Sequence, residues 1–169
     1  DDGTTFYALN GSATADAVRA GARSYQLLAE ILTSYLAERA DQPARAAWEA
    51  GEAWGRFLTE RPAPFRRVDA DTATVKLVEA LDKMGFEPEA ASKGQQREIL
   101  LHHCPFREVA EDHRDVVCAI HLGLTQGMLA ELASPLQVRG IEPFVAPGLC
   151  ITRLGIRDDD ADDRPSAHT

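Results

Sequence analysis

The sequence predicts an α+β fold in which helices, a long one first, precede a ββ-α-ββ unit with a mainly antiparallel four-stranded sheet. In the first half of the chain, apolar residues recur at helical spacing. In the second half, short apolar and β-branched runs are separated by turn signals, which is typical of strands joined as hairpins. The length of 169 residues suffices for one domain with a sizeable core.

The first predicted helix runs from Ser12 or Thr14, either of which can cap it, to about Arg39. Its apolar positions include a set that repeats every seven residues. This set comprises Val18, Tyr25 and Leu32. Such spacing is typical either of a helix packed on the core of its own domain or of a dimerisation helix, and the pattern leaves both open.

A second helix is expected from Pro43, which suits a first helical turn, to about Thr59. Gly51 and Gly55 lie four residues apart in it. Glycine costs about 1 kcal/mol relative to alanine inside a helix, so a neighbouring helix that approaches closely is a physical reason for both.

A third helix is capped by Asp69 or Asp71 and ended by Gly85. Its expected apolar residues are Val75, Val78, Leu81 and Met84. The elements after it are predicted to be a strand at 86–91, a turn at Lys93–Gly94, a strand at 97–103, a short helical turn that follows Cys104–Phe106 and reaches Glu111, a helix from Asp112 or Asp115 to Ser134, and strands at 136–144 and 149–156.

The net charge of −9 argues against this chain gripping nucleic acid by itself, because phosphate binding needs a basic face. Residues 158–169 contribute −4 and are expected to be disordered, and the rest of the chain remains acidic at −5. No apolar run approaches the roughly 20 residues that cross a bilayer. The odd number of three cysteines favours a cytoplasmic protein with reduced or metal-bound thiols over a secreted disulfide scaffold.

The three cysteines are the strongest candidates for chemistry. Cys104 follows a predicted strand, Cys118 lies on a predicted helix and Cys150 begins the last strand, all within the ββ-α-ββ unit. The fold can therefore bring them together, and thiolates with imidazoles suit zinc or an iron–sulfur cluster. Each of the last two, taken singly, is better read as a small buried side chain, and no Cys-x-x-Cys pair is present.

Two histidines are candidates to complete this ligand set. His121 follows Cys118 by three residues and so shares its helix face, and His103 immediately precedes Cys104. The sequence contains no Ser/His/Asp nucleophile motif, Gly-rich phosphate loop or His-Glu-x-x-His. We therefore expect a sensor rather than an enzyme, with a thiol redox switch or a cysteine-based enzyme as the remaining alternative.

Three aromatic residues of the second helix offer a different function. Trp48, Trp54 and Phe57 are more typical of a core, but they would also suit the lining of an apolar effector pocket between helices. In this alternative the chain senses a small apolar organic ligand and its cysteines are structural.

The residues around the cysteines also carry a likeness to a known group of proteins. The most specific segments are Cys104-Pro105-Phe106 and Val116-Val117-Cys118 with His121. They resemble the C-terminal sensor half of bacterial ArsR/DeoR-like helix-turn-helix regulators, the group that includes the SufR-type iron–sulfur regulators. The resemblance extends from about Phe6 to Leu154.

This resemblance implies the effector and dimerisation part of a homodimeric transcription factor, with DNA bound through an N-terminal winged helix outside this chain and no membrane partner. Residues 1–11 would be the remnant of the wing and linker. Residues 12–68 would form the helical dimerisation region, and residues 69–157 the α+β sensor domain.

In SufR-type regulators the cysteines hold an iron–sulfur cluster whose occupancy controls DNA binding. The matching positions here are Cys104, Cys118 and Cys150. The SufR-type pattern has a further cysteine between the second and the last of these, and this sequence has none. His121 or His103 would then supply the fourth ligand of the cluster or zinc ion, or a small molecule or an open site would complete it.

Overall fold

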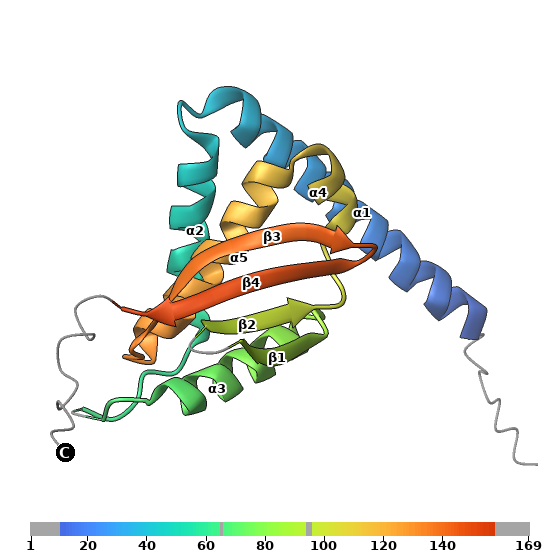
Figure 1. The fold of residues 1–169 in the computed structure, drawn as a ribbon. Coiled ribbons are helices and arrows are strands. Elements are labelled where there is room, and N and C mark those ends of the chain that lie inside the picture. The colour runs from blue at the N-terminus through green and yellow to red at the C-terminus, as the bar shows by residue number, and fades with distance from the viewer. Residues whose placement is uncertain (1–10, 65, 94–95, 158–169) are drawn as a thin grey trace, which may run out of the picture.

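The computed structural model describes residues 11–64, 66–93 and 96–157. Over these ranges it confirms the α+β class, with helices packed on a four-stranded antiparallel sheet (Figure 1). The elements are α1 (Gly11–Arg39), α2 (Pro43–Leu58), α3 (Ala70–Lys83), β1 (Pro88–Lys93), β2 (Gln96–Leu101), α4 (Arg107–Asp112), α5 (Arg114–Glu131), β3 (Leu136–Ala146) and β4 (Leu149–Ile156). No helix in the described ranges is long and apolar enough to cross a membrane.

The strands are ordered β1-β2-β4-β3, so β4 is an inner strand although it is the last in the chain. Ile99 and Leu101 of β2 pair with Thr152 and Cys150 of β4. All four are buried, and alternate residues of a strand share a face, so they lie on the covered face of the sheet. Helices α3 and α5 lie behind the sheet in Figure 1 and cover that face.

Helices α2 and α5 approach each other backbone to backbone, as the spacing of Gly51 and Gly55 predicts. A Cβ atom on Gly51 would lie 2.2 Å from the carbonyl oxygen of Ile120. The approach is reciprocal, because a Cβ on Gly123 would lie 2.0 Å from the carbonyl oxygen of Trp48. Glycine is therefore required on both helices, and the pair has no side chains between its main chains at these points.

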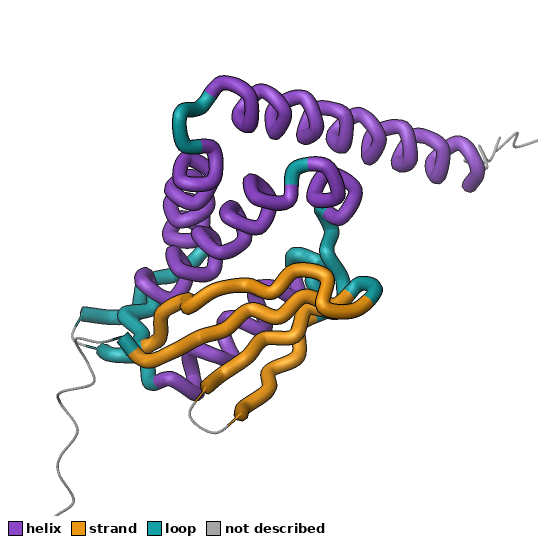
Figure 2. The backbone as a smooth tube through the Cα atoms, turned by 45° about the horizontal axis from the view of Figure 1, so that its top comes forward, coloured by secondary structure: helices purple, strands orange, loops and turns teal. Residues whose placement is uncertain are grey.

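Helix α1 extends away from the rest of the molecule (Figure 2). It contacts the body through Ala29, which packs beside Val109 and Val117, and through a 2.9 Å hydrogen bond between Ser34 Oγ and His113 Nε2. Most of its large apolar side chains are at least half exposed. We call this set the apolar face of α1: Tyr25, Leu27, Leu28, Ile31, Leu32 and Tyr35.

Two predictions about α3 are settled by its first turns. Asp69 is the cap rather than Asp71, because its Oδ1 accepts a 2.9 Å hydrogen bond from the N–H of Thr72. Val75, expected on the apolar side, is 56% exposed, whereas Leu77 is fully buried. Leu81 is buried, and Val78 and Met84 pack against the core as predicted, so Val75 is the one member of the predicted set that faces solvent.

Some predicted boundaries also move. The strand expected from Phe86 begins at Pro88, because Gly85 and Glu87 adopt positive φ and turn Phe86 into the core. Helix α5 begins at Arg114, with His113 at the cap position in place of either predicted aspartate. The expectations for residues 1–10, for Gly94 and for the 158–169 tail lie outside the described residues.

Candidate functional site

The structure brings the three cysteines together from three different segments. Cys104 lies in the loop between β2 and α4, Cys118 lies on α5 and Cys150 lies on β4. All three are free thiols, with Cys150 buried and the other two half-buried. They are close enough for a charge on one thiol to affect the pKa of another.

The environment keeps two of these thiols protonated. Burial first, and then the nearby Cys150 and Cys104, because thiolates repel each other, together raise the pKa of Cys118 to about 11. Burial also raises the pKa of Cys104, and a hydrogen bond from the backbone of Phe106 lowers it in part. A thiol is a weak nucleophile when protonated, so this environment disfavours nucleophilic attack by Cys104 or Cys118.

The thiol of Cys150 accepts a hydrogen bond from the backbone. The N–H of Phe144 donates to Cys150 Sγ over 3.4 Å. Phe144 lies in an irregular stretch of β3 between Glu142 and Ala146 and has a φ of 54°, which bulky residues rarely adopt. Backbone strain of this kind is concentrated at functional sites. Here the strained conformation directs the N–H of Phe144 toward the sulfur of Cys150 instead of a strand partner.

His121 is a buried imidazole with one unused nitrogen. Its Nε2 lies 3.0 Å from the hydroxyl of Thr152, and its Nδ1 has no hydrogen-bond partner. Burial lowers the pKa of His121 to about 4, so the ring is neutral near pH 7. A buried polar atom without a partner is uncommon and costs about 1–3 kcal/mol. This nitrogen is therefore a candidate ligand that the structure identifies more sharply than the sequence.

The other candidate histidine is engaged at the surface. His103 Nδ1 lies 2.7 Å from the carbonyl oxygen of Gly85, and the side chain is exposed. In the part of the chain that the structure describes, no three His, Cys, Asp or Glu side chains are arranged to hold a metal ion. Sulfur and imidazole nitrogen are ligands that suit zinc or an iron–sulfur cluster, but in the described residues these atoms are not arranged as a complete set of ligands.

The loop that carries Cys104 lies directly against α1. Pro105 and Phe106 line a cavity together with Tyr25 and Ala29 of α1. Close by, the side chain of Gln26 donates a hydrogen bond to Glu108 of α4. A displacement of the Cys104 loop would therefore act on the long helix.

The aromatic residues of α2 do not form the expected core. Trp54 and Phe57 are 58% and 78% exposed and contact each other edge to face, with ring centroids 5.4 Å apart. Trp48 is half-buried. The organic-ligand function assigned to these three side chains stays a prediction.

Sequence reasoning did not identify Phe144 or the partner glycines of α5. Gly123 and Gly127 have the same four-residue spacing as Gly51 and Gly55, and this repeat was the available signal. Phe144 has no comparable signal, because its backbone conformation depends on the irregular pairing of β3 with β4. The sequence matches no protein-family model and has no significant match among curated proteins.

Proposed function

We propose that the chain is the effector-sensing and dimerisation part of a bacterial, cytoplasmic transcriptional regulator, in which a cysteine-bound metal ion or iron–sulfur centre controls DNA binding by an N-terminal winged helix outside this chain. The observation that carries the proposal is the convergence of Cys104, Cys118 and Cys150, together with a buried imidazole nitrogen without a partner on His121, one helical turn after Cys118 on α5.

The proposed ligands are the three thiols and Nδ1 of His121. His121 is preferred to His103, because its free nitrogen is buried and has no other partner, whereas His103 is exposed and bonded to Gly85. The same closeness that makes the thiolates repel each other favours a cation between them. A metal centre bound there would link the Cys104 loop, helix α5 and strand β4.

Cys104 is the member of the set that lies outside a helix or strand. We infer that its loop makes the adjustment that completes the ligand shell. Because Pro105 and Phe106 of that loop face α1, loading and loss of the centre would favour different positions of α1. This contact supports a switch more than a purely structural metal site.

The apolar face of α1 supports the dimerisation role. Tyr25, Leu28 and Leu32 are at least half exposed, although full burial of such a side chain is worth about 1.5–3 kcal/mol. Contiguous exposed apolar surface of this kind marks an interaction site. A second copy of the chain, with the same seven-residue spacing, is the partner that we propose.

Metal and sulfide analysis after anaerobic purification, with a visible absorption spectrum, tests the proposed centre. We expect a stoichiometric metal or cluster that Cys118→Ser removes. Ala119→Ser is the matched control, because it makes a similar change one residue away on α5 and leaves every thiol in place. A metal-free, colourless parent protein, or a Cys118→Ser variant that retains the full metal content, would contradict the proposal.

A further inference from the structure

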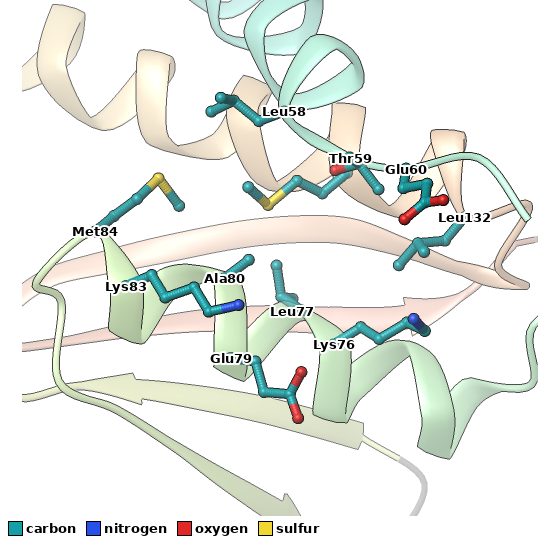
Figure 3. A pocket seen from close by; sticks show the side chains of 11 residues that line it. Leu58, Thr59, Glu60, Lys76, Leu77, Glu79, Ala80, Lys83, Met84 and Leu132 are labelled. Carbon is teal, nitrogen blue, oxygen red and sulfur yellow. The ribbon is translucent and has the colours of Figure 1, made fainter.

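A second candidate site lies where the end of α2 faces α3 and α5 (Figure 3). It is a cavity of about 310 Å3, which is at the lower end of the roughly 300–1,000 Å3 that is usual for small-molecule sites. Figure 3 shows Leu58 of α2 across the cavity from Leu77 and Ala80 of α3. The cavity shares no residue with the thiol set or with His121, so it is a different site from the proposed metal centre.

The inner walls of this cavity are apolar. The apolar side chains in its lining are Leu58, Leu77, Ala80, Met84, Met128 and Leu132. Leu77, Met128 and Leu132 are buried and belong to the hydrophobic core, so the cavity reaches the core from the surface. The two methionines are flexible and polarisable, which suits them to ligands of different shape. The hydroxyl of Thr59, which also lines the cavity, already donates to the carbonyl oxygen of Gly55 over 2.8 Å.

The charged side chains of the lining cancel one another. Lys76 and Lys83 contribute two positive charges, and Glu60 and Glu79 contribute two negative ones. All four residues are exposed, so water and salt also screen their charges. The cavity therefore favours neither an anion nor a cation, and its apolar walls select an uncharged ligand.

We propose that the cavity between α2, α3 and α5 binds a small uncharged apolar molecule. Transfer of the apolar surface of the ligand from water to these walls drives binding, and no charged group has to lose its hydration. Binding does not rest on the proposed metal function. In the proposed regulator, however, the cavity lies between the end of the dimerisation region, at Leu58, and the sensor domain, at Ala80, so an occupant would link the two parts.

Isothermal titration calorimetry on the full chain tests the inference with three probes. Octanol, octanoate and octylammonium share an eight-carbon chain and differ in the charge of the head group. We expect octanol to bind saturably, with one molecule per chain, and at least as tightly as either ion. Tighter binding of octanoate or octylammonium than of octanol would overturn the assignment of an uncharged ligand, and no saturable binding of octanol would overturn the site itself.

Two variants place the bound octanol in this cavity. Ala80→Leu fills the space and Leu58→Gln makes one wall polar, and each should weaken octanol binding about tenfold. Val75→Gln is the matched control for Leu58→Gln, because Val75 is 56% exposed and Leu58 is 52% exposed, and Val75 does not line the cavity. The control should leave the affinity unchanged, and circular dichroism checks that all three variants keep the fold.

Two further results would overturn the inference. The first is an octanol affinity that Leu58→Gln and Ala80→Leu leave unchanged. The second is a loss of self-association in Leu58→Gln but not in Val75→Gln, measured without any probe by analytical ultracentrifugation. The occupant of the cavity would then be a second copy of the chain rather than a small molecule.

Discussion

Replacement of Gly55 by alanine tests whether α2 and α5 are joined through their main chains. The added Cβ would lie 2.1 Å from the carbonyl oxygen of Leu124 and 2.9 Å from the amide nitrogen of Met128. Both are backbone atoms inside a helix, so neither can rotate aside. The helices must separate by about 1.3 Å, which is the difference between 2.1 Å and the ordinary contact distance of 3.4 Å.

We expect a net loss of about 2 kcal/mol in the free energy of unfolding. Overpacking of this kind costs about 3 kcal/mol, the upper end of the usual range, because no flexible side chain can yield. Alanine returns about 1 kcal/mol through its higher helix propensity. Gly21→Ala on α1 is the matched control, because nothing lies within 4 Å of its Cβ position and only the stabilising effect remains.

Urea unfolding followed by circular dichroism, at one fixed protein concentration, measures both effects. With a slope of about 2 kcal/mol per molar urea, the midpoint of Gly55→Ala should fall by about 1 M and that of Gly21→Ala should rise by about 0.5 M. A Gly55→Ala protein as stable as its parent would refute the backbone contact between α2 and α5.

Three further predictions concern ionisation and association. In chelator-treated protein the pKa of His121 is about 4 when folded and 6.5 when unfolded, so its contribution to stability is complete above pH 6.5 and decreases as the pH falls, by about 2 kcal/mol between pH 7.5 and pH 5. Urea unfolding at the two pH values measures this loss, which His121→Phe should reduce, and an unchanged loss would contradict it. Because the pKa of Cys118 is about 11, iodoacetamide should alkylate Cys118 at pH 8 at least tenfold more slowly than it alkylates free cysteine. Mass spectrometry measures both rates, and equal rates would contradict this prediction. Leu32→Glu should abolish self-association in analytical ultracentrifugation, whereas Val75→Glu, which is similarly exposed but lies on α3, should not; the same behaviour in both variants would argue against an α1 interface.

The order of the elements could be predicted because their boundaries carry strong local chemistry. Pro43 begins α2, Asp69 caps α3 and the Pro147–Gly148 turn joins the last two strands. Each of these residues acts through its own backbone restriction or a hydrogen bond a few residues away. The hairpins in turn predicted the antiparallel sheet, although its order, with β4 between β2 and β3, depends on pairing between distant residues.

The sequence predicted that the fold can bring the three thiols together, but it did not predict how they are arranged. A helix packed across two hairpins must bring residues such as Cys118 near the strand that carries Cys150. Whether His121 is a ligand candidate depends on which of its nitrogens finds a partner. That depends on Thr152, 31 residues away, so no local pattern contains it.

Exposure of apolar side chains was the least predictable feature. Trp54, Phe57 and Val75 have the same helical spacing as buried residues, and the sequence gives no sign that they face solvent. A residue's burial is decided by the elements that arrive from elsewhere in the chain. The glycines of α2 are the exception, because their helix penalty already requires a close neighbour.

Helix α1 is attached to the body near one end, so a small rotation there moves its other end by a large distance. Its 29 residues span about 44 Å at a rise of 1.5 Å per residue, and Gln26, Ala29 and Ser34, which hold it to the body, all lie in its C-terminal half. A rotation of about 5° about its C-terminal end displaces the beginning of the helix by about 4 Å. The distance between successive base pairs of DNA is about 3.4 Å. In the proposed regulator, a tilt of α1 by about 5° would therefore change the reach of each protomer by about one base pair.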